Sequence, residues 1–121
     1  MITQKDVREV QLAKGAIAAG IYTLMMRLGV DTEGLDKVIL AGAFGHYVRK
    51  DSAIASGMIP NLPLAKVHSV GNAAGEGAKL ALISTDVRCD ADSIAESIEY
   101  VELTTDFGFQ ERFADALMFG E

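Results

Sequence analysis

Two stretches of small residues are the parts of this sequence best suited to bind a ligand. "AGAFG" (41–45) follows the apolar run "VIL", and "GNAAGEGA" (71–78) follows "KVHSV". Without bulky side chains, the backbone can meet a flat base or a ribose, and helix N-termini attract phosphate. Because ligands of open α/β sheets bind beyond the carboxyl ends of the strands, we expect both stretches at one sheet edge. The glycines also suit tight packing of a helix on a strand, so both interpretations stay open.

A long amphipathic helix is predicted before the first stretch, over residues 4–28. Thr3 is the expected N-cap, with Asp6 completing a shortened capping box, and Gly29 is the expected C-cap. The apolar stripe of this helix, spaced by three and four residues, consists of Val7, Val10, Lys14, Ile17, Ile21, Leu24 and Leu28. Two glycines inside the helix each cost about 1 kcal/mol relative to alanine, which close packing of the backbone would offset.

The remaining pattern predicts an α/β fold with a short, mostly parallel sheet and flanking helices. Buried strands are expected at 37–41 and 66–71, with a possible third strand at 100–103. Helices are expected from Asp51 or Ser52 to Gly57, over 72–84, from Asp90 to about Ser97, and from Asp106 with Phe109, Phe113 and Leu117 buried. Two or three strands are too few for so many helices, so we expect the back half of a larger sheet domain.

Composition narrows the classes of protein and partner. The 121 residues fit one domain, and the excess of 17 acidic over 11 basic residues argues against a nucleic-acid partner. No apolar run is long enough to span a membrane, and no signal peptide is apparent, so we expect a cytoplasmic protein. Cys89 is the single cysteine of the sequence, which excludes a disulfide within the chain and any metal site built only from its thiolates.

Several motifs resemble one known family. "VILAGAFG" is similar to the adenosine motif of the actin, sugar kinase and Hsp70 ATPase superfamily, and "GNAAGEGAKLALIS" is similar to its last helix. More narrowly, "TQKDVREVQLAKGAIAAGI", "LAGAFGHYV", "VGNAAGEGA" and "YVELTTDFGFQERFADALMF" resemble the reductive activators of corrinoid proteins. These are ferredoxin-like iron–sulfur proteins with an ATPase domain of this type, and the resemblance covers essentially the whole chain. Ala43 departs from the superfamily, which often has a second glycine at that position.

The resemblance implies a fold and an activity. Residues 1–121 would be the C-terminal half-lobe of an RNase H-like ATPase domain of the actin and Hsp70 type. Family members use ATP with Mg²⁺ to drive an electron uphill from a 2Fe–2S cluster, returning a Co(II) corrinoid protein to Co(I). A 2Fe–2S cluster needs four thiolates, so we expect it upstream of this chain. The phosphate-binding turns and the Mg²⁺ carboxylates are expected there too, so we expect the isolated chain to be inactive.

The same resemblance suggests the site residues. Gly42, Ala43, Phe44 and Gly45 would line the nucleoside. After the second strand, Gly71 and Asn72 would complete this wall, although asparagine equally suits an N-cap.

Other polar residues have two interpretations each. Lys5 and Asp6 would lie near the phosphates and, through water, Mg²⁺; the alternative is plain capping and solvation. His46, beside Tyr47, would face the base or make a local hydrogen bond.

A second class of function is also compatible with the sequence. The chain would then be a non-enzymatic interaction or assembly module whose exposed faces dock a partner or a second copy. An unpaired sheet edge and an uncovered apolar helix face both favour such a homodimer.

Overall fold

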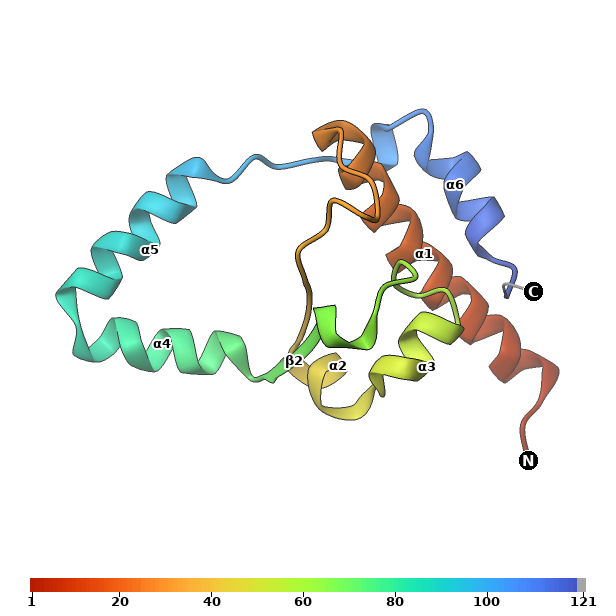
Figure 1. Cartoon of the computed structure of the whole chain (residues 1–121), viewed down its shortest axis with the longest axis horizontal. Helices are drawn as coiled ribbons and strands as arrows, with labels where there is room; N and C mark the ends of the chain where they lie inside the picture. Colours follow the sequence, from red (N-terminus) through yellow and green to blue (C-terminus); the bar gives the residue numbers. More distant parts are fainter. Residues whose placement is uncertain (120–121) are drawn as a thin grey trace.

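The sheet of the protein consists of two parallel strands. A computed structural model of the chain describes residues 1–119, apart from the side chain of Phe44. Strand β1 (Val38–Ala41) pairs with β2 (Val67–Gly71), and the two short helices that follow β1 in the chain contact β2 (Figure 1). Val38 pairs with Val67, but a register shift after Leu40 places Ala41 opposite Gly71. The predicted α/β class with a short parallel sheet is confirmed.

Helix α1 (Gln4–Leu28) has the predicted bounds because both of its ends are capped as expected. The backbone nitrogen of Thr3 donates to Asp6 Oδ2 at 2.8 Å, and the nitrogen of Asp6 donates to Thr3 Oγ1 at 3.3 Å. The hydroxyl of Thr3 also donates to Asp6 Oδ2, at 2.7 Å, and this bond together with that from the Thr3 nitrogen holds the pKa of the Asp6 carboxyl below its ordinary value. Gly29 ends the helix in a left-handed conformation, with φ 64°.

The prediction of which α1 face is buried was partly wrong: Lys14 is buried and Ile21 packs against the core, but both ends of the stripe are exposed. Four residues of the apolar stripe are exposed: Val7, Val10, Leu24 and Leu28. The buried positions are mostly small: Lys14, Gly15, Ala18, Ala19, Gly20, Thr23 and Met25. Helix α6 (Phe109–Ala116) packs closely along this face, and a Cβ at Gly15 would lie 3.2 Å from the carbonyl oxygen of Ala116. The close approach of the α1 and α6 backbones therefore requires a small residue at Gly15, in agreement with the close packing expected for the glycines of this helix.

Lys14 is buried at the same helix contact. Its ammonium group donates to the carbonyl of Met118 and lies 5.0 Å from the ring centroid of Phe119. Burial lowers the pKa of Lys14. The aliphatic stem thus lies inside the helix pair, while the charged end interacts with the chain segment after α6.

Several further elements differ from the sequence prediction, including α6, which begins at Phe109 and not at Asp106. The stretch after β1 is a short helix, α2 (Gly42–Tyr47), and α3 (Lys50–Ala55) begins after Arg49. Helix α4 (Ala73–Ile83) agrees with the prediction. Helix α5 (Thr85–Ser97) begins earlier than predicted because Ser84 is its N-cap, with a side chain that accepts a hydrogen bond from the backbone nitrogen of Val87. Residues 100–103 form no strand; Glu102 instead caps a short 3-10 helix, Leu103–Thr105. A second short 3-10 helix, Leu64–Lys66, precedes β2.

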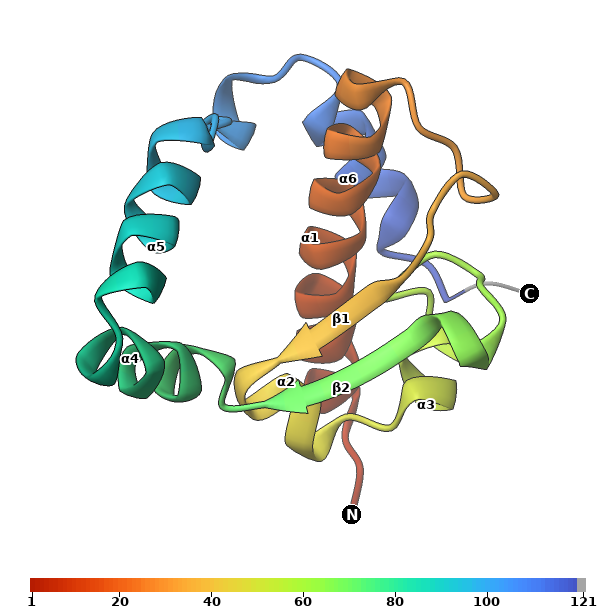
Figure 2. The same cartoon turned by 60° about the vertical axis from the view of Figure 1, so that its left-hand side comes forward.

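The elements form a packed part and an open arm (Figure 2). The core consists of Leu40, Ala53, Ile59 and Val67, with Ile21 of α1 packed against it. The arm consists of helices α4 and α5, which extend away from this core, and neither helix has a buried residue. Phe109 and Phe113 of α6 are half-buried, with their rings stacked at 6.3 Å between centroids, so the predicted burial of this tail is partial.

The hydropathy of the helices bears on membrane insertion. Across residues 1–119, every helix is too short or too polar to traverse a lipid bilayer.

Candidate functional site

The carboxyl ends of both strands carry glycines in a left-handed conformation. Gly42 has φ 67° and Gly71 has φ 56°, a region that L side chains rarely adopt. An added Cβ would meet no atom within 4 Å at either position, so open space lies beside both. Ala43 has a negative φ, which means that the left-handed turn occurs one residue earlier. Both turns therefore lie at one sheet edge, as predicted, and both leave the backbone accessible.

A shallow hollow of about 290 Å³ lies at this edge. Its lining residues come from the end of each strand and from α2: Gly42, Ala43, His46, Tyr47, Gly71 and Asn72. Four of the predicted site residues are thus brought together from two segments that are far apart in the sequence, 42–43 and 71–72. Three of the six lining residues are glycine or alanine, which leaves the backbone accessible to a flat ligand that needs close approach.

Gly45 has a packing role that differs from that of Gly42. A Cβ at Gly45 would overlap the carbonyl oxygen of Leu40, and it would lie 3.2 Å from the nitrogen of Gly71. The absence of a side chain therefore lets α2 fold back against the strand ends. Gly45 is outside the lining of the hollow, and the side chain of Phe44 lies outside the described part of the chain.

Asn72 is both an N-cap and a lining residue. Its Oδ1 accepts from the backbone nitrogen of Gly75 at 3.0 Å, which is the capping interpretation of the sequence. A Cβ at Gly75 would overlap the Asn72 carboxamide, so this glycine leaves room for the cap. The carboxamide oxygen is thus already hydrogen-bonded at the margin of the hollow.

His46 and Tyr47 are lining residues outside the predicted site set. Their rings are 4.9 Å apart between centroids and perpendicular, and both side chains are exposed. His46 lies four residues after Gly42, and Tyr47 four residues after Ala43, so a helix places each pair on one face. The sequence suggested His46 as a residue that faces the base, and a prediction of helix rather than turn after β1 would have found Tyr47 as well.

Lys5 and Asp6 lie in the first turn of α1, apart from the lining of this hollow. Asp6 lines a different hollow, of about 300 Å³, with Ile2, Val7, Val10 and Phe119. Its carboxylate accepts from Thr3, in agreement with the capping interpretation. The structure does not bring these two residues into one site with Gly42 and Gly71.

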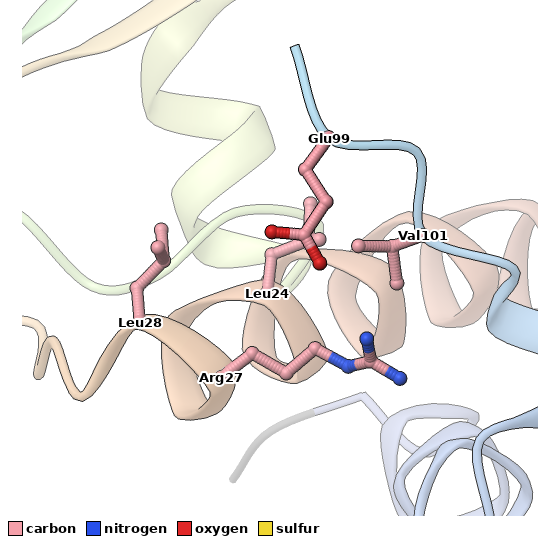
Figure 3. A pocket seen from close by; sticks show the side chains of 5 residues that line it. All are labelled: Leu24, Arg27, Leu28, Glu99 and Val101. Carbon is pink, nitrogen blue, oxygen red and sulfur yellow. The ribbon is translucent and has the colours of Figure 1, made fainter. Parts of the chain in front are cut away.

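A further hollow, of about 410 Å³, lies at the other end of α1. Figure 3 shows Glu99 and Val101, from the segment after α5, reaching toward Leu24 and Arg27. Arg27 forms an ion pair with Asp106, with 3.3 Å between the Nη2 of Arg27 and the Oδ2 of Asp106. This hollow is lined by helix and linker side chains rather than by strand ends, so it lacks the accessible backbone of the sheet edge.

Comparison with known proteins identifies the family. The family model described as "C-terminal domain of RACo the ASKHA domain" matches residues 1–121. The chain belongs to this family. It is 40% identical over 121 residues to the corrinoid activation enzyme RamQ of Eubacterium limosum, covering 100% of this chain and 20% of that protein. The resemblance to corrinoid activators seen in the sequence is thereby confirmed.

Two further relatives agree with this membership. A Co(II) methylated amine-specific corrinoid protein reductase of Methanosarcina barkeri is 38% identical over 71 residues, covering 59% of this chain and 13% of that protein. A solved "reductive activator for corrinoid,iron-sulfur protein" superposes with a TM-score of 0.88 and 34% identity, over 96% of this chain and 18% of that one. The chain therefore spans about a fifth of the length of these activators.

Proposed function

We propose that the chain is the nucleotide-binding C-terminal part of an ATP-dependent activator that returns Co(II) corrinoid proteins to Co(I). One observation carries the proposal: two parallel strands end in left-handed glycines, Gly42 and Gly71, beside one open hollow. Names of the relatives support the corrinoid partner, and family membership supports the ATPase fold. Reduction of Co(II) in these activators is the reaction that a bound nucleotide would drive.

In this proposal, the chain supplies one wall of the nucleoside site. The backbone at Gly42, Ala43 and Gly71 contacts the nucleoside, and α2 bounds the hollow on one side. Gly45 acts indirectly by allowing α2 to pack, and Asn72 holds the start of α4. Lys5 and Asp6 remain proposed phosphate-side residues, dependent on how the rest of the lobe lies against α1.

The cofactors of the reaction divide between this chain and the rest of the activator. ATP fits the hollow at its nucleoside end, where the backbone is accessible. Within residues 1–119, no three His, Cys, Asp or Glu side chains gather as a metal site. A 2Fe–2S cluster requires four thiolates, and the sequence holds Cys89 alone, so we assign the cluster and the Mg²⁺ ligands to other parts of the activator.

Titration with a fluorescent ATP analogue tests the proposal. Ala43 has a negative φ and lines the hollow, so Ala43→Glu places a carboxylate there without straining the backbone. We expect this variant to bind the analogue at least about tenfold more weakly, the effect of about 1.4 kcal/mol. Ala91→Glu on the exposed surface of α5 is the control and should bind normally. Equal affinity of both variants would contradict a nucleotide site at this edge.

A second function, protein association, is favoured by the exposed apolar residues of the arm. Leu82 and Ile83 of α4 are each 80% exposed, and Ile98 beyond α5 is 68% exposed. Apolar groups at such exposure mark surfaces that pack against another polypeptide. We propose a second copy of the chain as the occupant when the chain is alone, which makes a homodimer.

A further inference from the structure

Tyr47 is the largest side chain in the lining of the sheet-edge hollow. It is the last residue of α2, and 81% of its surface is exposed. Beside it, the lining consists of two glycines, one alanine, Asn72 and His46. An aromatic ring at the margin of a backbone-lined hollow is the one large apolar surface that a ligand there would meet.

The surroundings of Tyr47 leave its ring available. Within the described residues, its hydroxyl has no hydrogen-bond partner, whereas Tyr100, equally exposed at 81%, donates to Glu102 at 2.8 Å. His46 contacts the Tyr47 ring at a right angle, and a perpendicular contact covers at most one face of a ring. With 81% of the residue exposed and Tyr47 in the lining of the hollow, ring surface remains accessible to a ligand.

From this geometry, we infer that the base of the bound nucleotide stacks on the ring of Tyr47. The inference rests on the proposed nucleotide function and adds how the base is held. Three of the six lining residues, Gly42, Ala43 and Gly71, have no polar side-chain atoms, and the Oδ1 of Asn72 already accepts from Gly75, which leaves few side-chain partners for a base beside His46 and the amide nitrogen of Asn72. Stacking requires no side-chain hydrogen bond, because every base has a π face.

The size of the expected effect follows from other base–aromatic contacts. Removing one aromatic partner of a stacked base weakens binding by roughly 5- to 150-fold. A phenylalanine keeps the stacking surface, so Tyr47→Phe should retain affinity. Tyr47→Leu keeps an apolar side chain of moderate size but removes the flat ring, so it should weaken binding within that range.

Heteronuclear NMR titration of the 121-residue chain tests the inference, because it detects weak binding residue by residue. ATP, adenosine and base-free ribose 5-phosphate are added in turn, and amide shifts of Gly42, Gly71 and Tyr47 are followed. We expect ATP and adenosine to shift all three residues through the ring current of the base, and ribose 5-phosphate to leave Tyr47 unshifted. Tyr100→Leu is the matched control, and its affinity should equal that of the unchanged chain.

The outcomes separate the inference from the function on which it rests. Unchanged ATP affinity in Tyr47→Leu, with clear shifts at Gly42 and Gly71, would overturn stacking and leave the nucleotide site intact. A loss in Tyr47→Phe equal to that in Tyr47→Leu would also overturn it, because the hydroxyl would then be the contact. If ATP shifts none of the lining residues of the unchanged chain, the proposed site itself fails.

Discussion

Gly42 and Gly29 share a backbone conformation but differ in their surroundings. Their φ angles are 67° and 64°, and a Cβ at either would meet open space. Gly29 ends α1, whereas Gly42 lies at the hollow. The pair therefore separates the cost of backbone strain from an effect on a ligand.

Replacement of each glycine by alanine should destabilise the fold by a similar amount. A left-handed conformation costs an L residue about 1–2 kcal/mol, so Gly42→Ala and Gly29→Ala should each lower the free energy of unfolding by that much. Chemical denaturation measures this cost. Nucleotide titration should show weaker binding for Gly42→Ala alone, and equal affinities of the two variants would assign Gly42 to the turn only.

The conformation of Gly42 changes an expectation from the sequence. The small-residue pattern alone predicts that Gly42→Val weakens nucleotide binding far more than it destabilises the fold. Since φ is positive, the valine would strain the turn as well, and both effects should be substantial. Backbone dihedral angles at one residue are not encoded in a pattern of small side chains, so the sequence could not separate these effects.

At the scale of elements, glycines in two helices should respond oppositely to substitution. A Cβ added at Gly15 would lie 3.2 Å from the carbonyl oxygen of Ala116 in α6. A Cβ added at Gly77 in α4 would meet nothing within 4 Å. We expect Gly15→Val to cost about 1–3 kcal/mol of unfolding free energy through overpacking. Gly77→Ala should stabilise α4 by up to about 1 kcal/mol through helix propensity. Thermal and chemical denaturation measure the two effects, and a stable Gly15→Val chain would contradict close packing of α1 on α6.

Asp106 should make the attachment of α6 sensitive to acid. Burial alone would raise the pKa of Asp106, but hydrogen bonds from Arg27 and from the Gly108 nitrogen, with the charge of Arg112, hold it below its ordinary value. Arg112 also donates to Thr23 of α1 at 2.9 Å, so these residues tie α6 to α1. A carboxylate whose pKa is lower in the folded chain than in the unfolded chain stabilises the fold. This stabilisation is complete above the unfolded pKa of 3.8, and it is lost as the pH falls through the folded pKa.

Melting temperatures across acidic pH test this role of Asp106. We expect Asp106→Asn to lower the melting temperature near neutral pH and to reduce its further fall below pH 3.8. Glu111, exposed on α6, supplies the control variant Glu111→Gln, which should melt like the unchanged chain. An identical acid profile for Asp106→Asn would exclude this carboxylate as the source of the pH dependence.

Element types were predictable where local signals were complete. Thr3, Asp6 and Gly29 fixed both ends of α1, and unbroken apolar runs located both strands. The buried face of α1 was not predictable, because it depends on how closely α6 approaches. Residues 100–103 have strand-like composition, but Tyr100 and Thr104 instead bond to Glu102.

The candidate site was predictable in part for the same reason. Small residues after each strand located Gly42, Ala43, Gly71 and Asn72. The distinction between Gly42 and Gly45 requires the position of α2 against Leu40, a contact that arises only on folding. Lys5 and Asp6 were assigned by resemblance, and in the described chain Asp6 completes the capping box of α1.

At the scale of the whole molecule, we expect the isolated chain to self-associate. Helix α6 folds back on α1, but it covers the small-residue face and leaves Leu28 77% exposed, along with Leu82 and Ile83 at 80%. Light scattering over a dilution series should show a mass above the monomer at high concentration. Leu82→Glu with Ile83→Glu should shift this equilibrium toward monomer, and Ala91→Glu should not. A monomer mass at every concentration would refute the association.

The lack of burial in α4 and α5 also determines how this part of the chain opens. Their 11 and 13 residues are held by hydrogen bonds within each helix, and isolated helices of this length are marginal in water. Amide hydrogens of the arm should therefore exchange with deuterium far faster than those of α1, and trypsin should cleave first within the arm, after Lys79 or Arg88. In the lone chain, this segment is close to local unfolding. A polypeptide that docks on the arm should therefore slow the exchange of its amide hydrogens, and this protection can be measured residue by residue.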